Sequence, residues 1–342
     1  MSWQGEGRAP AAGGVGVHPE RAIEGIWAAV PTPFLADCTL DLAGIRSNAR
    51  RFVDDLGLAG IYCNGLMGEG WALDVSERQA ALDAIIETVG GRAAVGVVVT
   101  HHSHAETLTL ARHADRAGAH HVVLMRPRSP LSAAELHDHV VGVADAVSRA
   151  VVLFESAIAG LRFGRPAIVR LAREGAILAV KAALEVEETN RLREACGERI
   201  LVIDPREDNW LANLRRFGQS ALYADPEPYL FQTRASQPIV AYGKAFGRGD
   251  LAEARRLRAT LDPLRGVYGR WILRPLGRGL APNAALKAWC ELLGLAGGPV
   301  RPPLKPLGRT KRFALEADIR SAASCDRSPL PTGSEMGAAW PR

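Results

Sequence analysis

Short apolar runs alternate along the chain with longer segments whose apolar residues recur at helical spacing. Eight of the short runs are rich in β-branched or aromatic residues, and we predict strands at 25–30, 60–65, 93–100, 121–126, 150–155, 177–182, 200–205 and 221–226. Several of the intervening segments begin with Ser or Asp and end with Gly, as helices do. Strands that are apolar on both faces and separated by helices are typical of a parallel sheet.

This repeat predicts the fold class. Eight strand and helix units favour an α/β fold of the (β/α)8 (TIM) barrel type over a doubly wound sheet. We place the barrel at residues 23–227 and a C-terminal helical extension at 228–307, where further segments of helical periodicity occur. Residues 1–22 are predicted to be a flexible leader. Residues 308–342 are basic and rich in Pro and Ser, and we expect a disordered tail there.

Composition and charge narrow the possible partners. The chain has 342 residues, 47% of them hydrophobic, which is enough for a substantial core. Its net charge is +5, but residues 301–342 alone hold eight basic and four acidic residues, so the body of the protein is close to neutral. We therefore expect no nucleic-acid and no membrane partner. Five scattered cysteines without metal-ligand spacing, and the lack of a signal peptide or membrane-length apolar run, favour a cytoplasmic protein.

One lysine, Lys181, interrupts the apolar run LAVKAALEV at residues 178–186. Side chains alternate along a strand, so Lys181 shares a face with the small residues Ala179 and Ala183, which leave space in front of the amine. Burial lowers the pKa of an amine, and a neutral amine condenses with a carbonyl group to form a Schiff base. The alternative is a lysine that reaches water or pairs with Glu155 or Asp204.

Four segments together carry a family resemblance. They are AAVPTPF at 28–34, GLMGEGWALDVSERQ at 65–79, the strand with Lys181, and ALKAWCELLGLAGGPVRPPLKPL at 285–307. In this order and spacing the chain resembles the dihydrodipicolinate synthase and N-acetylneuraminate lyase family from about residue 24 to 307. The resemblance implies a class I aldolase-type barrel with a Schiff-base lysine on strand six, a small-molecule carbonyl substrate, no cofactor and no metal. It also implies a homo-oligomer, a dimer or a tetramer.

The chain departs from the family at positions that matter for chemistry. Where the family has a Thr-Thr pair that holds a 2-keto acid carboxylate, this sequence has Leu66 and Met67 after Gly65. We predict that these three residues bind substrate, with a backbone N–H in place of the hydroxyls and a weaker affinity for pyruvate. The family tyrosine on strand five, which shuttles protons, is replaced by Phe154, which lines the site and transfers no proton.

Three residues are candidates for the missing acid or base. Tyr223 lies near the end of strand eight, although a tyrosine of the barrel core is as plausible. His102 in THHSH at 100–104 titrates near neutral pH, with a solvated loop as the alternative. Glu155 follows Phe154 directly and points to the opposite side of a regular strand.

Three further residues are predicted to bind substrate. Arg126 and Arg128, in RPRSP where the family has Pro-Tyr-Tyr, offer a fork for a carboxylate or phosphate. Asp204 ends strand seven and either hydrogen-bonds a hydroxylated substrate or caps the next helix. We interpret Glu69 as structural support.

The sequence therefore predicts a lyase of aldolase or dehydratase type that forms an imine at Lys181 and is not a standard dihydrodipicolinate synthase. One alternative is a catalytically silent barrel with a binding or regulatory role, in which the lack of a phenol at Phe154 is by itself enough to stall imine chemistry. Another is a metal-dependent aldolase or hydrolase that uses the histidines of THHSH.

Overall fold

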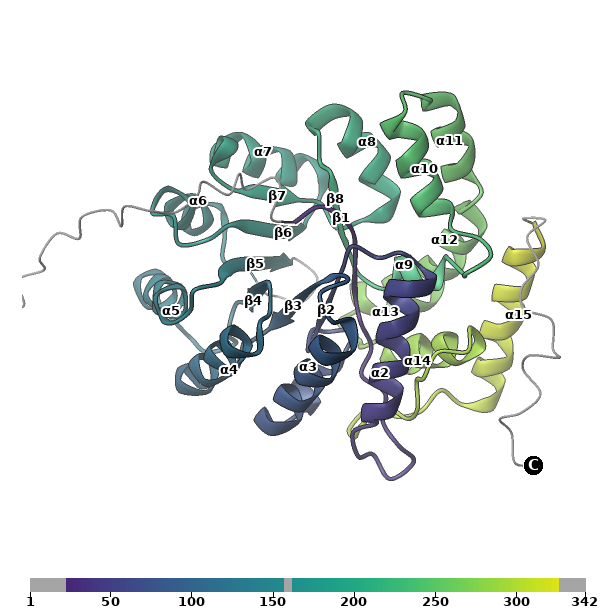
Figure 1. The fold of residues 1–342 in the computed structure, drawn as a ribbon, viewed down its shortest axis with the longest axis horizontal. Coiled ribbons are helices and arrows are strands. Elements are labelled where there is room, and N and C mark those ends of the chain that lie inside the picture. The colour runs from purple at the N-terminus through teal and green to yellow at the C-terminus, as the bar shows by residue number, and fades with distance from the viewer. Residues whose placement is uncertain (1–22, 157–161, 326–342) are drawn as a thin grey trace, which may run out of the picture.

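The computed structural model describes residues 23–156 and 162–325. Eight parallel strands form one sheet in the order β7-β6-β5-β4-β3-β2-β1-β8 (Figure 1). They are β1 (Gly25–Ala29), β2 (Gly60–Cys63), β3 (Ala94–Val98), β4 (His121–Met125), β5 (Ala150–Ser156), β6 (Ala179–Ala183), β7 (Leu201–Ile203) and β8 (Ala221–Ala224). Every predicted strand is present, and the predicted (β/α)8 barrel is confirmed.

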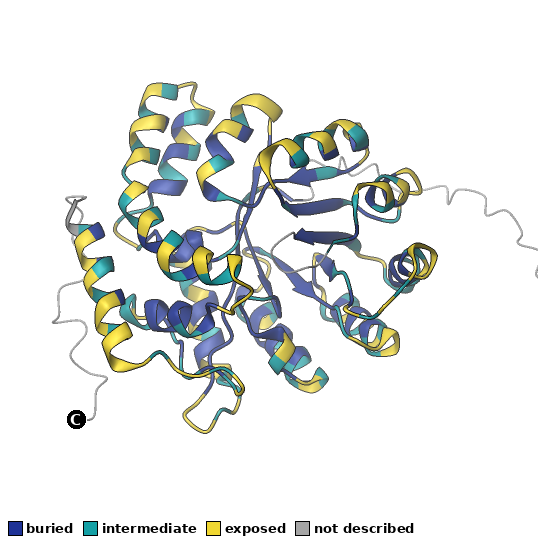
Figure 2. Cartoon of the chain, turned by 180° about the vertical axis from the view of Figure 1, so that it is seen from behind, coloured by how far each residue is buried: buried dark blue, intermediate teal, exposed yellow. Residues whose placement is uncertain are grey.

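The helices between the strands form a ring outside the sheet. They are α2 (Leu42–Arg50) with its continuation η1 (Arg51–Asp55), α3 (Val75–Val89), α4 (His104–Ala117), α5 (Ala133–Ala146), α6 (Arg165–Arg173), α7 (Val186–Cys196) and α8 (Glu207–Phe217), with short turns η2 (Gly70–Ala72) and η3 (Gly197–Arg199). Figure 2 shows the strands buried and the outer helix faces exposed. Capping side chains begin several helices, such as Asp74 for α3 and Ser132 for α5, which explains why their starts could be predicted from sequence.

A side chain completes the seam between β7 and β8. The ladder of strand pairs is interrupted there, although the two strands are in contact. Gln219 Nε2 donates to the carbonyl oxygens of Asp204 and Ala221, both at 2.9 Å, and its Oε1 accepts from Asp204 N at 3.0 Å. The buried amide thus satisfies main-chain groups that a continuous ladder would otherwise pair.

Several aromatic rings pack against one another inside the barrel. The Trp27 ring lies 5.1 Å from the His121 ring and 5.3 Å from the Tyr223 ring, measured between centroids. A Cβ at Gly60 would lie 2.3 Å from the Trp27 ring, and one at Gly96 would lie 2.4 Å from His121 Nε2. The two glycines therefore make room for the rings inside the barrel.

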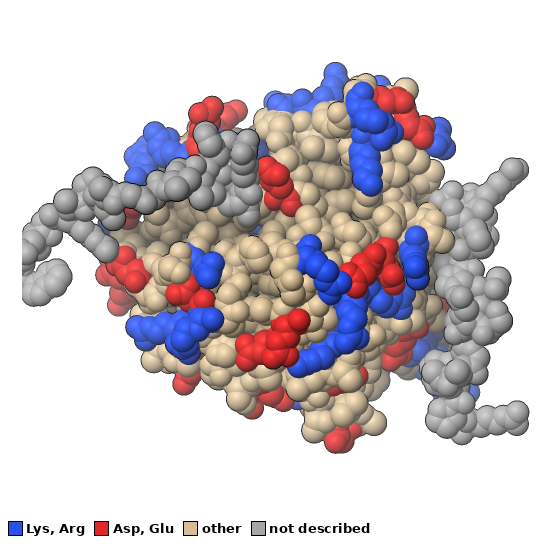
Figure 3. Space-filling model, in the orientation of Figure 1, with Lys and Arg blue, Asp and Glu red and all other residues tan. Residues whose placement is uncertain are grey.

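A helical extension follows β8 and lies against one side of the barrel (Figure 1). It consists of α9 (Glu227–Leu230), α10 (Pro238–Gly247), α11 (Leu251–Ala259), α12 (Asp262–Tyr268), η4 (Gly269–Leu273), α13 (Arg274–Gly277), α14 (Asn283–Leu292) and α15 (Arg309–Cys325). No described helix is both long and apolar enough to cross a membrane. On the face shown in Figure 3, basic and acidic side chains are interspersed rather than gathered into a field of one sign.

Helix α15 corrects the expectation of disorder over residues 308–342. Its Leu315, Ile319 and Ala322 are buried, and the helix packs against α12 and α14. The apolar stripe at helical spacing stabilises the helix by packing against the extension. The basic composition of the segment had suggested disorder instead. Residues 326–342, like the predicted leader 1–22, lie outside the described part of the chain.

Candidate active site

Lys181 lies on β6 with its side chain inside the barrel and 1% exposed. Its Nζ donates to Asp225 Oδ1 at 2.5 Å and to the hydroxyl of Tyr62. Asp225 follows β8 directly, and its side chain is 26% exposed, so the amine lies just below the solvent at the carboxyl ends of the strands. This is the end of a (β/α)8 barrel at which active sites occur. Neither Glu155 nor Asp204, the partners considered from sequence, contacts the amine.

Aromatic rings enclose the amine. Lys181 Nζ lies 4.7 Å from the centre of the Phe154 ring, 4.8 Å from that of Tyr62 and 5.9 Å from that of Tyr223. Phe154 and Lys181 are direct neighbours in the pairing of β5 with β6. The rings remove water from one side of the nitrogen while the quadrupoles of their faces favour a cation there.

Tyr62 is the phenol at the amine, and sequence reasoning missed it. Its hydroxyl lies within donating distance of Ala224 O at 3.1 Å and Asp225 Oδ1 at 3.2 Å. Burial, with the nearby Asp225 carboxylate, raises the pKa of Tyr62 well above its usual range, so the phenol stays protonated. Burial, with the same carboxylate, also raises the pKa of Glu227, which lies two residues further along the chain.

Tyr223, the phenol chosen from sequence, points its hydroxyl elsewhere. Its ring stacks on that of Tyr62 with centroids 4.5 Å apart, but its hydroxyl hydrogen-bonds His121 Nε2 at 2.7 Å. His121 is the first residue of β4, so this bond lies at the amino end of the strands, away from Lys181. The structure therefore brings the Tyr223 ring to the site but not its acidic proton.

His121 gives a pH dependence of stability. Burial lowers the pKa of its imidazole to about 3, so below its ordinary value near 6.5 the unfolded chain binds a proton that the folded chain does not. The free energy of unfolding is thus expected to fall by about 1.4 kcal/mol for each unit by which the pH is lowered from 6.5 toward about 3. In urea titrations at about pH 7 and pH 5, the wild type should lose about 2 kcal/mol more than His121→Gln, which cannot titrate. Equal losses in the two proteins would contradict the assignment.

The loop after β2 carries the three predicted substrate-binding residues, Gly65, Leu66 and Met67. Asn283, at the start of α14, donates its Nδ2 to the carbonyl oxygens of Leu66 at 3.0 Å and Met67 at 3.1 Å. No hydrogen bond joins the backbone N–H of Leu66 or Met67 to another residue in the described part of the chain. The extension therefore fixes this loop, in which two backbone N–H groups have no hydrogen-bond partner among the described residues.

Glu69 joins the same loop to the C-terminal part of the chain. It is fully buried, forms an ion pair with Lys287 at 2.7 Å and accepts from Arg301 N at 3.0 Å. A Cβ on the next residue, Gly70, would lie 1.9 Å from Asn64 O, which explains the glycine. Glu69 thus has the structural role that was predicted from sequence.

Glu155 binds a loop rather than facing the amine. Its carboxylate accepts from Phe163 N at 2.6 Å, Gly164 N at 3.2 Å and Arg162 Nε at 2.9 Å. It lies beside Phe154 but on the opposite face of β5, as strand alternation requires. The geometry gives Glu155 a positioning role and does not bring it to Lys181.

None of the predicted basic residues is among the described side chains that contact the amine. His102 is exposed in the loop between β3 and α4, and Arg128 is exposed beyond β4. Arg126 is partly buried, and its Nε lacks a hydrogen-bond partner among the described residues. Over residues 23–156 and 162–325, no three His, Cys, Asp or Glu side chains are arranged as a metal site.

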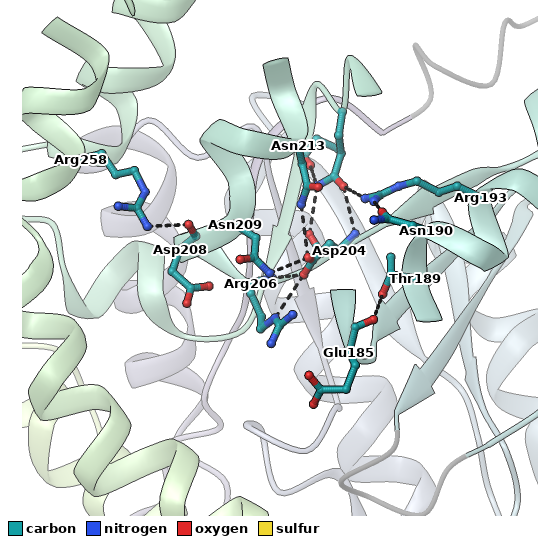
Figure 4. A network of polar contacts seen from close by, with 12 residues as sticks. Glu185, Thr189, Asn190, Arg193, Asp204, Arg206, Asp208, Asn209, Asn213 and Arg258 are labelled. Atoms are coloured by element: carbon teal, nitrogen blue, oxygen red, sulfur yellow. Dashed lines mark hydrogen bonds and ion pairs between the residues drawn. The ribbon is translucent and has the colours of Figure 1, made fainter. Parts of the chain in front are cut away.

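Asp204 is the centre of a polar network at the start of α8 (Figure 4). Its Oδ1 accepts from Arg206 N at 3.0 Å, and its Oδ2 accepts from the side-chain amides of Asn209 at 2.8 Å and Asn213 at 3.3 Å. The carboxylate is 2% exposed and its oxygens are satisfied within the protein. Of the two roles considered, this geometry favours support of the helix start.

Removing this carboxylate should destabilise the protein. In Asp204→Ala one buried and two partly buried donors lose their acceptor, and we expect the free energy of unfolding to fall by about 2 kcal/mol in urea titrations. Asp208→Ala is the matched control, because only its backbone oxygen takes part in the contacts of this turn, where it accepts from Arg258. The control should change stability by less than about 0.5 kcal/mol. Similar losses in both variants would show that the network does not stabilise α8.

A parallel (β/α)8 barrel with a lysine amine buried near the carboxyl ends of its strands is the arrangement found in the class I aldolase-type barrels. The sequence profile of the dihydrodipicolinate synthetase family matches residues 22–322. The chain belongs to this family, as its sequence motifs indicated.

Similar proteins span nearly the whole chain. The 4-hydroxy-tetrahydrodipicolinate synthase of Acidothermus cellulolyticus is 32% identical over 296 residues, covering 86% of this chain and 91% of the relative. A prophage protein of the same family from E. coli K12, solved in complex with pyruvate, has a TM-score of 0.76 at 24% identity and covers 88% of this chain and 98% of its own. A catalytic lysine mutant of the sialic acid aldolase of Ruminococcus gnavus has a TM-score of 0.75 at 16% identity, over 90% and 98% of the two chains. These identities mark a divergent member of the family.

Proposed function

We propose that the protein is a lyase of aldolase or dehydratase type that acts through a Schiff base between Lys181 and a small carbonyl substrate, a 2-keto acid or a related compound. One observation carries this proposal. The Lys181 amine is buried beneath the barrel mouth and contacts both a phenol and a carboxylate. Membership of a family of lyases, and the catalytic lysine of the sialic acid aldolase with the same fold, support it.

The chemistry follows from the amine. Nζ attacks the substrate carbonyl carbon, the oxygen leaves as water, and the resulting iminium withdraws electrons from the neighbouring carbon. In an aldol cleavage, the C–C bond one carbon further along breaks as the hydroxyl beyond it loses its proton to a base, and the electron pair of that bond is held as an enamine. In a dehydration, the neighbouring carbon first loses a proton to give the enamine, which then expels the hydroxyl of the next carbon as water when that oxygen is protonated. The free N–H groups of Leu66 and Met67 are available for a substrate carboxylate, and Arg126 offers a charge at the same end of the barrel.

The substrate differs, in this proposal, from that of the synthases to which the chain is similar. Leu66, Met67 and Phe154 replace two hydroxyls and a phenol of the family pattern by apolar groups. Apolar walls favour a less polar substrate, because unpaired polar groups of a ligand lose hydrogen bonds to water. A homo-oligomer, a dimer or a tetramer, and a cytoplasmic location belong to the same proposal.

Reduction with borohydride tests the proposal. The protein is incubated with pyruvate, 2-oxobutanoate or propanal, reduced, and weighed as an intact chain by mass spectrometry. We expect the mass of one reduced adduct per chain with at least one of these compounds. Folded protein that gains no mass with any of them would instead favour the silent barrel.

A further inference from the structure

We propose that Tyr62 and Asp225 form the acid–base pair that carries protons between the Lys181 amine and the substrate oxygen. The phenol that the family has on strand five would then stand on β2 in this chain. This inference rests on the proposed imine at Lys181, and it assigns to two residues the proton transfer that Phe154 cannot perform.

Contacts among the three side chains carry the argument. Lys181 Nζ donates both to the Tyr62 hydroxyl and to Asp225 Oδ1, and the Tyr62 hydroxyl lies 3.2 Å from the same Oδ1. Each of the three polar groups therefore lies within hydrogen-bond reach of the other two. A general acid or base must be within such reach of the proton that it moves. Among the described residues, no other phenol hydroxyl contacts the amine.

The position of Phe154 explains how the phenol can change strands. The centroids of the Phe154 and Tyr62 rings lie at nearly equal distances from Nζ, 4.7 and 4.8 Å. The two rings come from β5 and β2, so they reach one amine from different walls of the barrel. Both rings therefore lie against the same amine, and a chain with the hydroxyl on Tyr62 can have phenylalanine at position 154.

The proton inventory of imine formation balances with this pair. Asp225 takes one proton from the ammonium group of Lys181, and the neutral amine forms the C–N bond as the carbonyl π bond breaks. Tyr62 gives its proton to the new alkoxide and recovers one from the nitrogen, which leaves a neutral carbinolamine. The proton held by Asp225 then passes through Tyr62 to the hydroxyl, which departs as water while the C=N bond forms as an iminium. The nitrogen has lost two protons, the oxygen has gained two, and the pair is restored.

The surroundings keep the phenol in its acid form. Tyr62 is 4% exposed, and its ring stacks on that of Tyr223 at 16° between planes. Burial and the Asp225 carboxylate raise its pKa, so a free tyrosinate is unfavourable. Tyr62 therefore donates one proton as it accepts another, while the stacked ring and the bond toward Ala224 O hold its hydroxyl in place.

The test compares rates of adduct formation. Using whichever of pyruvate, 2-oxobutanoate and propanal labels the wild type fastest, we expect Tyr62→Phe to form the reduced adduct at least about 100-fold more slowly. Asp225→Asn should slow it similarly, because an amide does not accept the ammonium proton. Tyr62→Phe/Phe154→Tyr should recover at least about tenfold of the lost rate, since it returns a phenol to the amine from β5. Such a rescue is not expected of a purely structural tyrosine.

Tyr229→Phe is the matched control. It removes another buried phenol hydroxyl, which donates to Ala29 O at 2.8 Å and does not contact Lys181, and it should label at the wild-type rate. Circular dichroism and thermal melting confirm that each variant is folded. A wild-type rate for Tyr62→Phe, or a loss that Phe154→Tyr does not restore, would overturn the inference while leaving the imine intact. A wild type that forms no adduct with any probe would instead overturn the proposed function itself.

Discussion

Replacing Lys181 by alanine is expected to abolish imine formation and to lower turnover of the natural substrate by about 10⁴-fold or more, because a residue that forms a covalent intermediate has no substitute. Lys181→Arg should fail equally, since a guanidinium group keeps the charge but does not act as an amine nucleophile. Adduct mass after borohydride reduction and steady-state rates are the measurements. The fold should survive, because the Asp225 carboxylate left behind is 26% exposed and can be hydrated.

The control for this experiment is Lys244→Ala. Lys244 is exposed on α10 and is not among the residues that contact the Lys181 amine, so its loss should leave adduct formation at the wild-type level. Residual activity of more than about a tenth in Lys181→Ala would mean that the reaction does not pass through an imine at this residue.

Breaking the buried ion pair between Glu69 and Lys287 is expected to cause the largest loss of stability. In Lys287→Met the Glu69 carboxylate stays fully buried without its cation, and we expect a loss of about 3–5 kcal/mol in urea titrations. Lys287 also donates to Pro299 O at 2.7 Å, so the same change removes a hydrogen bond to the segment that connects α14 to α15. Burial lowers the pKa of Lys287, because the ammonium group loses contact with water. The nearby Glu69 carboxylate offsets part of this effect.

Two further variants test the origin of that loss. The double variant Glu69→Gln/Lys287→Met should recover part of the stability, because it leaves no unpaired buried charge. Arg320→Ala, which removes a surface pair with Glu316 on α15, should change stability by less than about 0.5 kcal/mol. A Lys287→Met protein as stable as the wild type would show that the pair does not hold the loop after β2.

The fold could be predicted from sequence because buried parallel strands leave a plain signal. A strand covered by helices on one side and by the barrel interior on the other is apolar on both faces, so it appears as a continuous apolar run. A charged residue inside such a run, as at Lys181, stands out for the same reason. Helix α15 was missed because its stripe of Leu315, Ile319 and Ala322 is diluted by basic residues, although the spacing itself was available.

The partners of Lys181 were harder to predict. Two tyrosines, Tyr62 and Tyr223, lie on strands, and sequence alone does not say which hydroxyl points toward the amine. That depends on the stagger of the strands and on what else fills the interior. Here His121 binds the hydroxyl of Tyr223, while Tyr62 reaches across the barrel to β6. Asp225 directly follows β8, and its contact with the amine on β6 depends on how these strands are arranged in the barrel, which the sequence alone does not show.

Locating the reduced adduct by peptide mass spectrometry tests the central claim most directly. The chain has five lysines, and two of them, Lys181 and Lys287, are buried to the same degree. Lys287 is held by Glu69 and Pro299 O, whereas Lys181 lies at the barrel mouth. The account predicts the adduct on the peptide that contains Lys181 and none on the peptide that contains Lys287. An adduct on Lys287 or on surface lysines, with Lys181 unmodified, would contradict it.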